Sequence, residues 1–152
     1  MIHLVRRFLQ SIVDKRPDPT DEAWLLGLLT EAEAVLYRQM SAADRCHALR
    51  SARCPALADD FQRVAAALHD AGKIRAGLGT WARVGATLVG VVFPRGLRGR
   101  WAEYRDHPRV GAEMLREAGS AQLTAVWAAE HHLPPLKSSL PPEVAAALAA
   151  AD

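Results

Sequence analysis

The hydrophobic positions along the chain recur at helical spacing, and the alternation of apolar and polar residues that is typical of strands is almost absent. In the segment from position 59 to position 71, Phe61, Val64, Ala65 and Leu68 fall on one face of a helix, and a glycine follows as a natural stop. We therefore expect a helix here with this face buried. For the whole chain the pattern predicts an all-α bundle of roughly six to nine helices.

Capping residues predict where several other helices begin and end. A hydroxyl followed three residues later by a carboxylate occurs at Thr30 and at Ser41, so a helix should start at each. Prolines suited to a first helical turn stand at Pro108 and Pro142, and Gly119 is suited to close the helix that Pro108 opens. The chain shows no repeat and no change of composition that would mark a domain boundary.

Two of the later helices place polar side chains where they can reach the interior. One of them contains Trp127, which we expect in the core, and ends at His131 and His132. In the last helix, Leu148 and Asp152 lie four residues apart, so that Asp152 shares the core-facing stripe.

Composition limits the classes of function. The chain has 152 residues, 50% of them hydrophobic, and a formal net charge of +2. These values fit one compact soluble domain with a core of its own, and they give no strong case for nucleic acid or a membrane as partner. The apolar stretch at 81–93 is too short to cross a bilayer. The basic stretch at 95–100 is either a solvated loop or an anion-binding one, and the oligomeric state stays open.

Cysteine usage and the N-terminus indicate a reducing compartment. Cys46 and Cys54 would stand about 12 Å apart on one helix, whereas a disulfide requires about 7 Å or less between Cα atoms. The mostly apolar segment 1–13 is interrupted by two arginines, and no small-residue cleavage site of a signal peptide follows it. We expect a cytoplasmic protein.

The chemistry of the chain is concentrated in an ordered series of His and Asp residues. Each member lies near a predicted helix end or on an inward stripe, so separate helices can bring them to one point in the bundle. Imidazole and carboxylate ligands without thiolate suit Fe, Mn, Zn or Ni and argue against a structural zinc site. The series consists of His47, His69, Asp70, His107, His131, His132 and Asp152.

This series resembles the HD superfamily of metal-dependent phosphohydrolases, whose order is a first His, an HD pair and a distal Asp. The motifs that carry the resemblance are ALHDAGKI at 67–74, HPRVGAEML at 107–115, AEHH at 129–132 and the terminal LAAAD. The resemblance implies a single-domain, all-α HD-type helical bundle over 41–152, with helices of residues 1–40 packed on it. The layout is similar to the His-elaborated HD-GYP branch. The GYP tripeptide is absent, and Leu133 stands where an acidic residue is common.

The resemblance also implies roles for individual residues. His47, His69, Asp70 and Asp152 would hold one divalent ion, and Asp70 would bridge to a second ion held by His107 and by His131 or His132. The expected ions are Fe, Mn, Ni or Zn, with Mg as a further candidate. Lys73 would face the phosphate of the substrate, so that Asp70 and Lys73 are the expected catalytic residues, and Arg109 is a candidate clamp for the same phosphate.

Each of these residues also has a simpler structural interpretation. His107 can serve as an N-terminal cap, Asp152 as a charged helix end, and Lys73 as a cation that complements a helix dipole. Arg109 can be merely exposed. His132 can be a ligand, a hydrogen-bond donor behind a ligand, or a solvated residue at the end of a helix.

The function implied by the resemblance is hydrolysis of a small phosphate ester, with a nucleotide as the expected substrate class, by metal-activated water. Two alternatives stay open. One is a metal-binding regulatory module that binds a nucleotide or a protein partner with little or no turnover. The other is a dinuclear-iron oxygenase, because a few members of the superfamily oxidise carbon–hydrogen bonds. The sequence does not determine the substrate, the native metal or the number of ions.

Overall fold

A computed structural model describes residues 16–76 and 106–152, and within these ranges every regular element is a helix. The prediction of an all-α fold is confirmed. The predictions made for the apolar stretch at 81–93 and for the basic stretch at 95–100 lie outside the described residues. The helices are α2 (Pro19–Leu26), α3 (Glu31–Gln39), α4 (Ala42–Ala52), α5 (Asp60–Leu68), α6 (Lys73–Ala76), α9 (His107–Glu117), α10 (Gln122–Glu130), the 3₁₀ helix η1 (Pro135–Lys137) and α11 (Pro142–Ala151).

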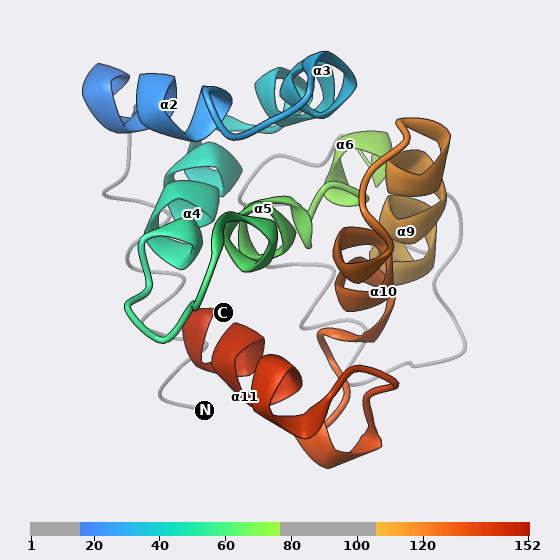
Figure 1. The fold of residues 1–152 in the computed structure, drawn as a ribbon. Coiled ribbons are helices and arrows are strands. Elements are labelled where there is room, and N and C mark those ends of the chain that lie inside the picture. Colours follow the sequence, from blue (N-terminus) through green and yellow to red (C-terminus); the bar gives the residue numbers. More distant parts are fainter. Residues whose placement is uncertain (1–15, 77–105) are drawn as a thin grey trace, which may run out of the picture.

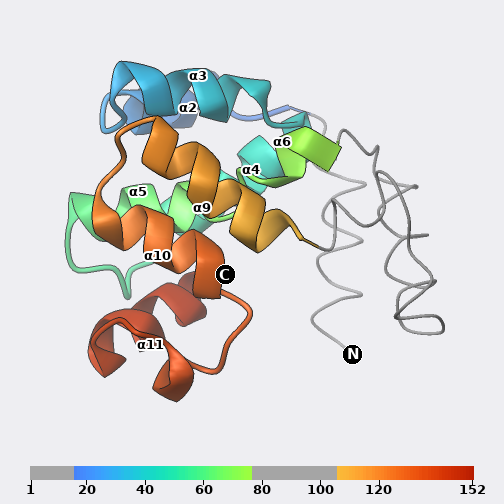
Figure 2. The ribbon, with the colours of Figure 1, turned by 90° about the vertical axis from the view of Figure 1, so that its right-hand side faces the viewer.

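Helix α5 lies at the centre of the bundle and packs against α4, α10 and α11 (Figure 1). Helices α9 and α10 pack on each other, and α6 contacts α9. Helices α2 and α3 cover one end of this arrangement, and α11 lies at the opposite end in both views (Figures 1 and 2). The C-terminal end of α5, which carries the HD pair, is therefore surrounded by helices from distant parts of the sequence.

The predicted caps are present at the helix ends. Thr30 forms a full capping box with Glu33, and the Ser41 hydroxyl accepts a hydrogen bond from the backbone N–H of Asp44. At the end of α9, Gly119 takes a positive φ of 71°, which a residue with a side chain rarely adopts. Local sequence therefore determines where these helices start and stop.

Apolar side chains from most of the helices form two neighbouring clusters. The larger joins α2 and α3 to the central helices through fully buried residues such as Leu25, Tyr37 and Leu68. The smaller joins α5 and α10 to α11 around Trp127 and Leu148, which are 1% and 0% exposed. The prediction that Trp127 belongs to the core is confirmed, and the second cluster fixes α11 in place.

One predicted core residue is wrong. Phe61 is 66% exposed, although it shares a helical face with the buried residues Val64, Ala65 and Leu68. The neighbouring Gln62 is buried instead, and its side-chain oxygen accepts a hydrogen bond from the backbone N–H of Ala58 at 3.0 Å. Helical spacing gives the direction of a side chain, but exposure depends on whether another element covers that turn.

Helices α2 and α4 are also joined by polar contacts. The Arg53 guanidinium lies 3.8 Å from the centre of the Trp24 ring, and its Nη2 donates to Asp21 at 2.5 Å. Together with the shared apolar cluster, these contacts pack α2 on the helices that carry the HD pair. The expected division into residues 1–40 and 41–152 stays a prediction.

Candidate metal centre

The HD pair stands where α5 ends, at the centre of the bundle. His69 follows the last residue of α5 and Asp70 lies in the turn beyond it, with 1% and 2% of their surfaces exposed. The Nδ1–H of His69 donates to the Ala66 carbonyl at 2.7 Å. Because a carbonyl oxygen can only accept, this bond orients the ring so that Nε2 faces the other polar residues of the site.

One group of polar side chains gathers around the Nε2 of His69. Oδ1 of Asp152, at the end of α11, lies 3.3 Å from it, and Oδ2 of Asp70 lies 3.5 Å from it. His47, on α4, brings its Nε2 to 3.4 Å from the same Asp152 oxygen. The structure thus brings together these four residues, which the HD resemblance assigned to one ion, and we call them the first set.

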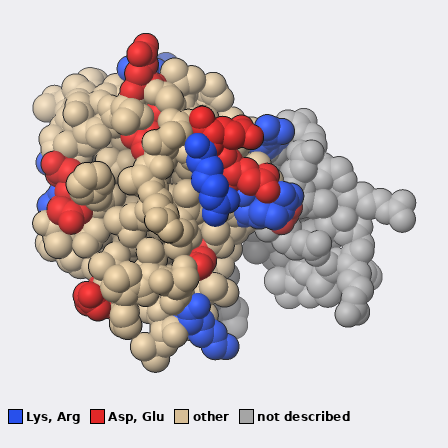
Figure 3. All heavy atoms as spheres, turned by 45° about the vertical axis from the view of Figure 1, so that its right-hand side comes forward, with Lys and Arg blue, Asp and Glu red and all other residues tan. Residues whose placement is uncertain are grey.

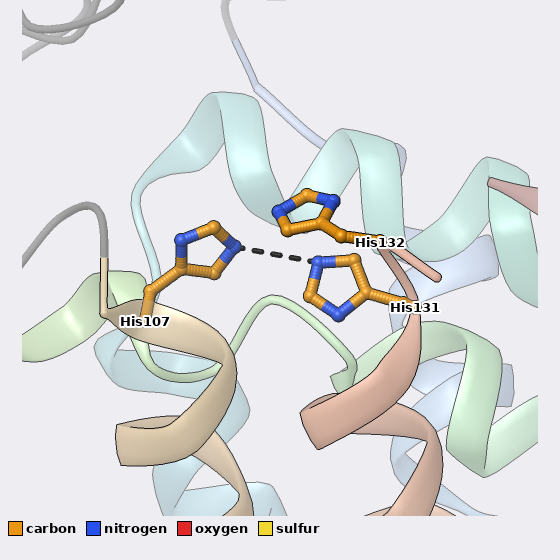
Figure 4. A group of neighbouring side chains, drawn as sticks. All are labelled: His107, His131 and His132. Atoms are coloured by element: carbon orange, nitrogen blue, oxygen red, sulfur yellow. Dashed lines mark hydrogen bonds between the residues drawn. The ribbon is translucent and has the colours of Figure 1, made fainter. Parts of the chain in front are cut away.

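A second group consists of three histidine rings at the facing ends of α9 and α10 (Figure 4). His107 begins α9, and His131 and His132 follow the last residue of α10. The Nε2 atoms of His107 and His131 are 3.4 Å apart. The centre of the His132 ring lies 4.0 Å from that of His131 and 5.2 Å from that of His107. These three residues form the second set.

Asp70, a member of the first set, lies beside the second set and turns one carboxylate oxygen toward the histidines of each. Its Oδ2 faces His69 of the first set. Its Oδ1 lies 3.3 Å from the Nε2 of His107 and 3.8 Å from that of His131. A single buried carboxylate therefore contacts both groups of histidines.

Two glycines allow α9 to approach the HD turn closely enough for this contact. A Cβ placed on Gly72 would lie 1.9 Å from the carbonyl oxygen of His107 and 2.7 Å from the backbone nitrogen of Gly111. A Cβ on Gly111 would lie 2.9 Å from the backbone nitrogen of Gly72. All three distances are below ordinary van der Waals separation, so only glycine fits at Gly72 while His107 stays beside Asp70.

Charges in the site favour bound cations. Burial alone would raise the pKa of Asp70, but the charges of Lys73 and His69 and a hydrogen bond from His107 hold that pKa well below its usual value. Burial alone would lower the pKa of His69, but the carboxylates of Asp70 and Asp152 raise it above normal. The anionic surroundings that favour a proton on His69 also favour a metal cation.

Two histidines of the second set, His131 and His132, have lowered pKa values. Burial, together with the charge of His69, lowers the pKa of His131 to about 3. Burial also lowers the pKa of His132. The Nδ1–H of His131 donates to the Ala128 carbonyl at 2.9 Å, which leaves the Nε2 lone pair facing the site. Neutral imidazoles with a free lone pair are the form of histidine that binds metals.

The residues present fit a divalent metal. The Nε2 of His69 is buried and has no hydrogen-bond partner of good geometry among the described residues, although two carboxylates lie within 3.5 Å. The ligand atoms of His47, His69 and Asp70 all lie within 4.8 Å of one another, and the same holds for the three histidines of the second set. Ligands at about 2.1 Å from one ion lie roughly 3–4 Å apart, so small adjustments complete either site.

Lys73 and Arg109 are placed differently from each other. The Lys73 ammonium forms a short ion pair with Oδ2 of Asp70, and its side chain is 12% exposed. The Arg109 guanidinium is 61% exposed and pairs with Asp106 and Glu113 on the outside of α9. Figure 3 shows one face of the molecule, on which a group of Lys and Arg side chains is interleaved with Asp and Glu. A role for either residue in binding substrate stays a prediction.

Sequence reasoning missed one polar residue beside the second set. Glu130 ends α10, and its carboxylate accepts hydrogen bonds from Ser138 and Ser139 in the connection to α11. Glu130 stands in the AEHH motif, but nothing in the sequence identifies its partners. Gly72 and Gly111 likewise stand in the quoted motifs, and their contact became evident only from the packing of α9 against the turn that precedes α6.

Comparison with known proteins identifies the family of the chain. The family model described as HD domain matches residues 52–152, about two thirds of the chain. No curated protein and no solved structure shows a significant match. His47 lies shortly before the matched segment, and the fold brings it to the HD pair.

A further observation concerns membranes. In the two ranges that the structure describes, every helix is too short or too polar to span a bilayer.

HD domains are metal-dependent phosphohydrolases as a family, and the clustered His and Asp side chains can hold a metal. With a matching family model over most of its length, an all-α fold and this cluster, the chain belongs to the HD-domain family.

Proposed function

We propose that the chain hydrolyses a small phosphate ester, with a nucleotide as the expected substrate class, at a centre of two divalent metal ions. The first set would hold one ion through His47, His69, Asp70 and Asp152. The second set would hold the other together with the remaining oxygen of Asp70. Fe, Mn, Ni and Zn suit these nitrogen and oxygen donors, and Mg is a further candidate.

The observation that carries the proposal is the position of Asp70. Its two oxygens face different sets of histidines, at 3.5 Å on one side and 3.3 Å on the other. A structural carboxylate that only balanced one buried histidine would not need a second group of three histidines on its other side. Two adjacent sets that share one carboxylate are the arrangement expected of a two-metal hydrolytic site.

The protein residues would orient the centre and bind the substrate. When bound, the ions would supply a nucleophilic water at neutral pH and positive charge for the phosphate oxygens. His69 and His131 are held in a fixed orientation by backbone carbonyls. Lys73, beside Asp70 and partly open to solvent, can turn its ammonium toward a phosphate.

We also propose that the protein works in the cytoplasm. Cys46 lies in α4 and Cys54 lies just beyond its end, a spacing that does not suit a disulfide between the two, as expected of a chain from a reducing compartment.

The proposal is tested by metal analysis and by a substrate panel on the same protein. The chain is purified without chelator, and its content of Fe, Mn, Ni, Zn and Mg is measured. Hydrolysis is then assayed with nucleotides, cyclic dinucleotides and simple monoesters, each with every one of these metals. We expect close to two ions per chain and metal-dependent release of phosphate or of a nucleotide from at least one substrate class.

Two variants serve as test and control. His69→Ala should remove activity and lower the metal content, whereas Asp60→Ala, which removes an exposed carboxylate from the opposite end of α5, should change neither. Metal binding without hydrolysis of any substrate would favour the regulatory module. Absence of bound metal in the wild-type chain would remove the basis of the proposal.

A further inference from the structure

His69 at the end of α5 and the pair His131 and His132 at the end of α10 differ in what holds their rings. His69 and His131 each donate an Nδ1–H to a backbone carbonyl, at 2.7 and 2.9 Å. Among the described residues, none forms a hydrogen bond with the His132 ring. His132 contacts the other rings of the second set only through ring packing. Its position must therefore be set by the backbone that carries it.

That backbone is the connection between α10 and α11, and Glu130 ties it at two points. The carbonyl oxygen of Glu130 accepts from the N–H of Leu133 at 2.7 Å, which closes a turn around His131 and His132. Its carboxylate Oε2 accepts from the Ser138 hydroxyl and the Ser139 N–H, and its Oε1 accepts from the Ser139 hydroxyl, each at 2.7 Å. One residue thus binds both ends of the connection.

The geometry points to Glu130 as a positioning residue that holds His132 in the second metal set by tying the connection between α10 and α11. This inference rests on the proposed function, because it assigns Glu130 to the centre proposed there. Glu130 itself directs its carboxylate to the serines and is no candidate ligand. The turn fixes where His132 leaves α10, and the carboxylate fixes the chain beyond it, so the backbone holds this exposed residue beside His107 and His131.

A carboxylate is the group that this role requires. All three side-chain hydrogen bonds to Glu130 come from donors, namely two hydroxyls and one backbone N–H. An amide in the same place would keep one oxygen for two of these donors, but its NH₂ group would have to donate to the Ser139 hydroxyl, and it would lack the negative charge that strengthens hydrogen bonds to a carboxylate. Glu130→Gln should therefore weaken the tie while it keeps the size of the side chain, and Glu130→Ala should remove the tie.

The test is a titration of the metal-free full chain with Mn²⁺, followed by calorimetry and by electron paramagnetic resonance. Calorimetry gives the affinity for each ion, and the resonance spectrum separates an isolated Mn²⁺ from a coupled pair. In Glu130→Ala we expect the first ion to bind as in wild type and the second about 10–100-fold more weakly, which is typical of loss of a residue behind a ligand. Glu130→Gln should show a smaller loss, with the coupled-pair signal reduced at the same Mn²⁺ concentration.

Glu143→Ala is the matched control, because it removes an exposed carboxylate from the start of α11 and should leave both affinities unchanged. Thermal unfolding of each metal-free variant shows whether it folds, and Glu130→Gln provides the comparison if Glu130→Ala does not. Wild-type affinity for both ions in the Glu130 variants overturns the inference and leaves the proposed function intact. An equal loss of both ions also overturns it, because the effect is then a general loosening. A wild-type chain that binds no second ion overturns both.

Discussion

Lys73 is a cation placed against a prospective metal ligand. Its ammonium pairs with Oδ2 of Asp70, the oxygen that faces His69, and it helps to keep the pKa of Asp70 low. Asp70 therefore stays ionised without metal. With metal bound, the positive charge of the ions takes over that task, and the ammonium becomes available to a phosphate.

We predict that Lys73→Met leaves the metal content unchanged and lowers kcat/KM for the active substrate by about tenfold to a hundredfold. The estimate follows from a hydrogen bond to a charged group, worth about 1.5–3 kcal/mol. Metal analysis and steady-state kinetics check the two parts separately. Lys137→Met, at an exposed lysine of η1, is the control and should change neither. Unchanged kinetics would show that Lys73 serves only to balance Asp70.

At the level of single residues, sequence predicted the types of side chain in the site better than their partners. The order of His and Asp residues, read with the HD resemblance, named every member of the two sets that the structure brings together. The contact between Lys73 and Asp70 and the surface ion pairs of Arg109 depend on side-chain directions in the folded state. Motif spacing contains no such information. Phe61 was misplaced for a different reason, because helical spacing does not tell whether another element covers that turn.

At the level of helices, the close packing of α9 against the turn after α5, which contains Asp70, depends on Gly72. A side chain there would meet backbone atoms of His107 and Gly111, which cannot rotate away. We predict that Gly72→Ala lowers stability by about 3 kcal/mol, the upper part of the range for overpacking, and lowers Tm by roughly 6–12 °C. It should also weaken the binding of the second metal ion, because His107 must move away from Asp70.

Calorimetric unfolding and Mn²⁺ titration check this prediction. Gly27→Ala is the matched control, since a Cβ there would lie 3.3 Å from the nearest atom, the carbonyl oxygen of Trp24, at an ordinary φ of −68°. Its stability should stay within about 1 kcal/mol of wild type. If Gly72→Ala proves no more harmful than Gly27→Ala, the close approach does not determine the position of α9.

Helix α11 brings Asp152 to the first set and is fixed through Leu148. Leu148 is fully buried in the cluster around Trp127, and Asp152 follows the last residue of the helix. We predict that Leu148→Ala lowers the free energy of unfolding by about 2–5 kcal/mol. It should weaken binding of the first ion more than binding of the second. Leu136→Ala is the control, because Leu136 is 87% exposed. A destabilised Leu148→Ala that keeps its first-ion affinity would show that Asp152 is not a ligand.

For the whole molecule, sequence predicted the fold class and most helix ends, because caps and apolar spacing are local signals. Thr30, Ser41 and Gly119 each act where the pattern placed them. The arrangement of the helices around α5 is not a local property, because it depends on which faces pack together over long sequence separations. The family resemblance supplied that information in general form, and the contact of Gly72, in the turn before α6, with Gly111 of α9 refines it.

The two sets draw ligands from the middle of α4 and from the ends of α5, α9, α10 and α11, so bound metal would connect helices from most of the described chain. A ligand that binds only the folded state stabilises it by RT ln(1 + [L]/Kd), about 2.7 kcal/mol when [L] is 100 times Kd. We therefore predict that Mn²⁺ at this excess raises the Tm of the metal-free chain by roughly 5–11 °C, and that a chelator reverses the rise.

Scanning calorimetry of the chain with and without Mn²⁺ measures this effect. Asp70→Asn keeps the size of the side chain and removes the charge that both sets share, so the rise should be lost in this variant. Asp60→Asn, at an exposed carboxylate of the same helix, should keep it. An equal rise in all three proteins would show that Mn²⁺ binds elsewhere on the surface. A rise in wild type that Asp70→Asn abolishes would instead link the stability of the whole bundle to one buried carboxylate.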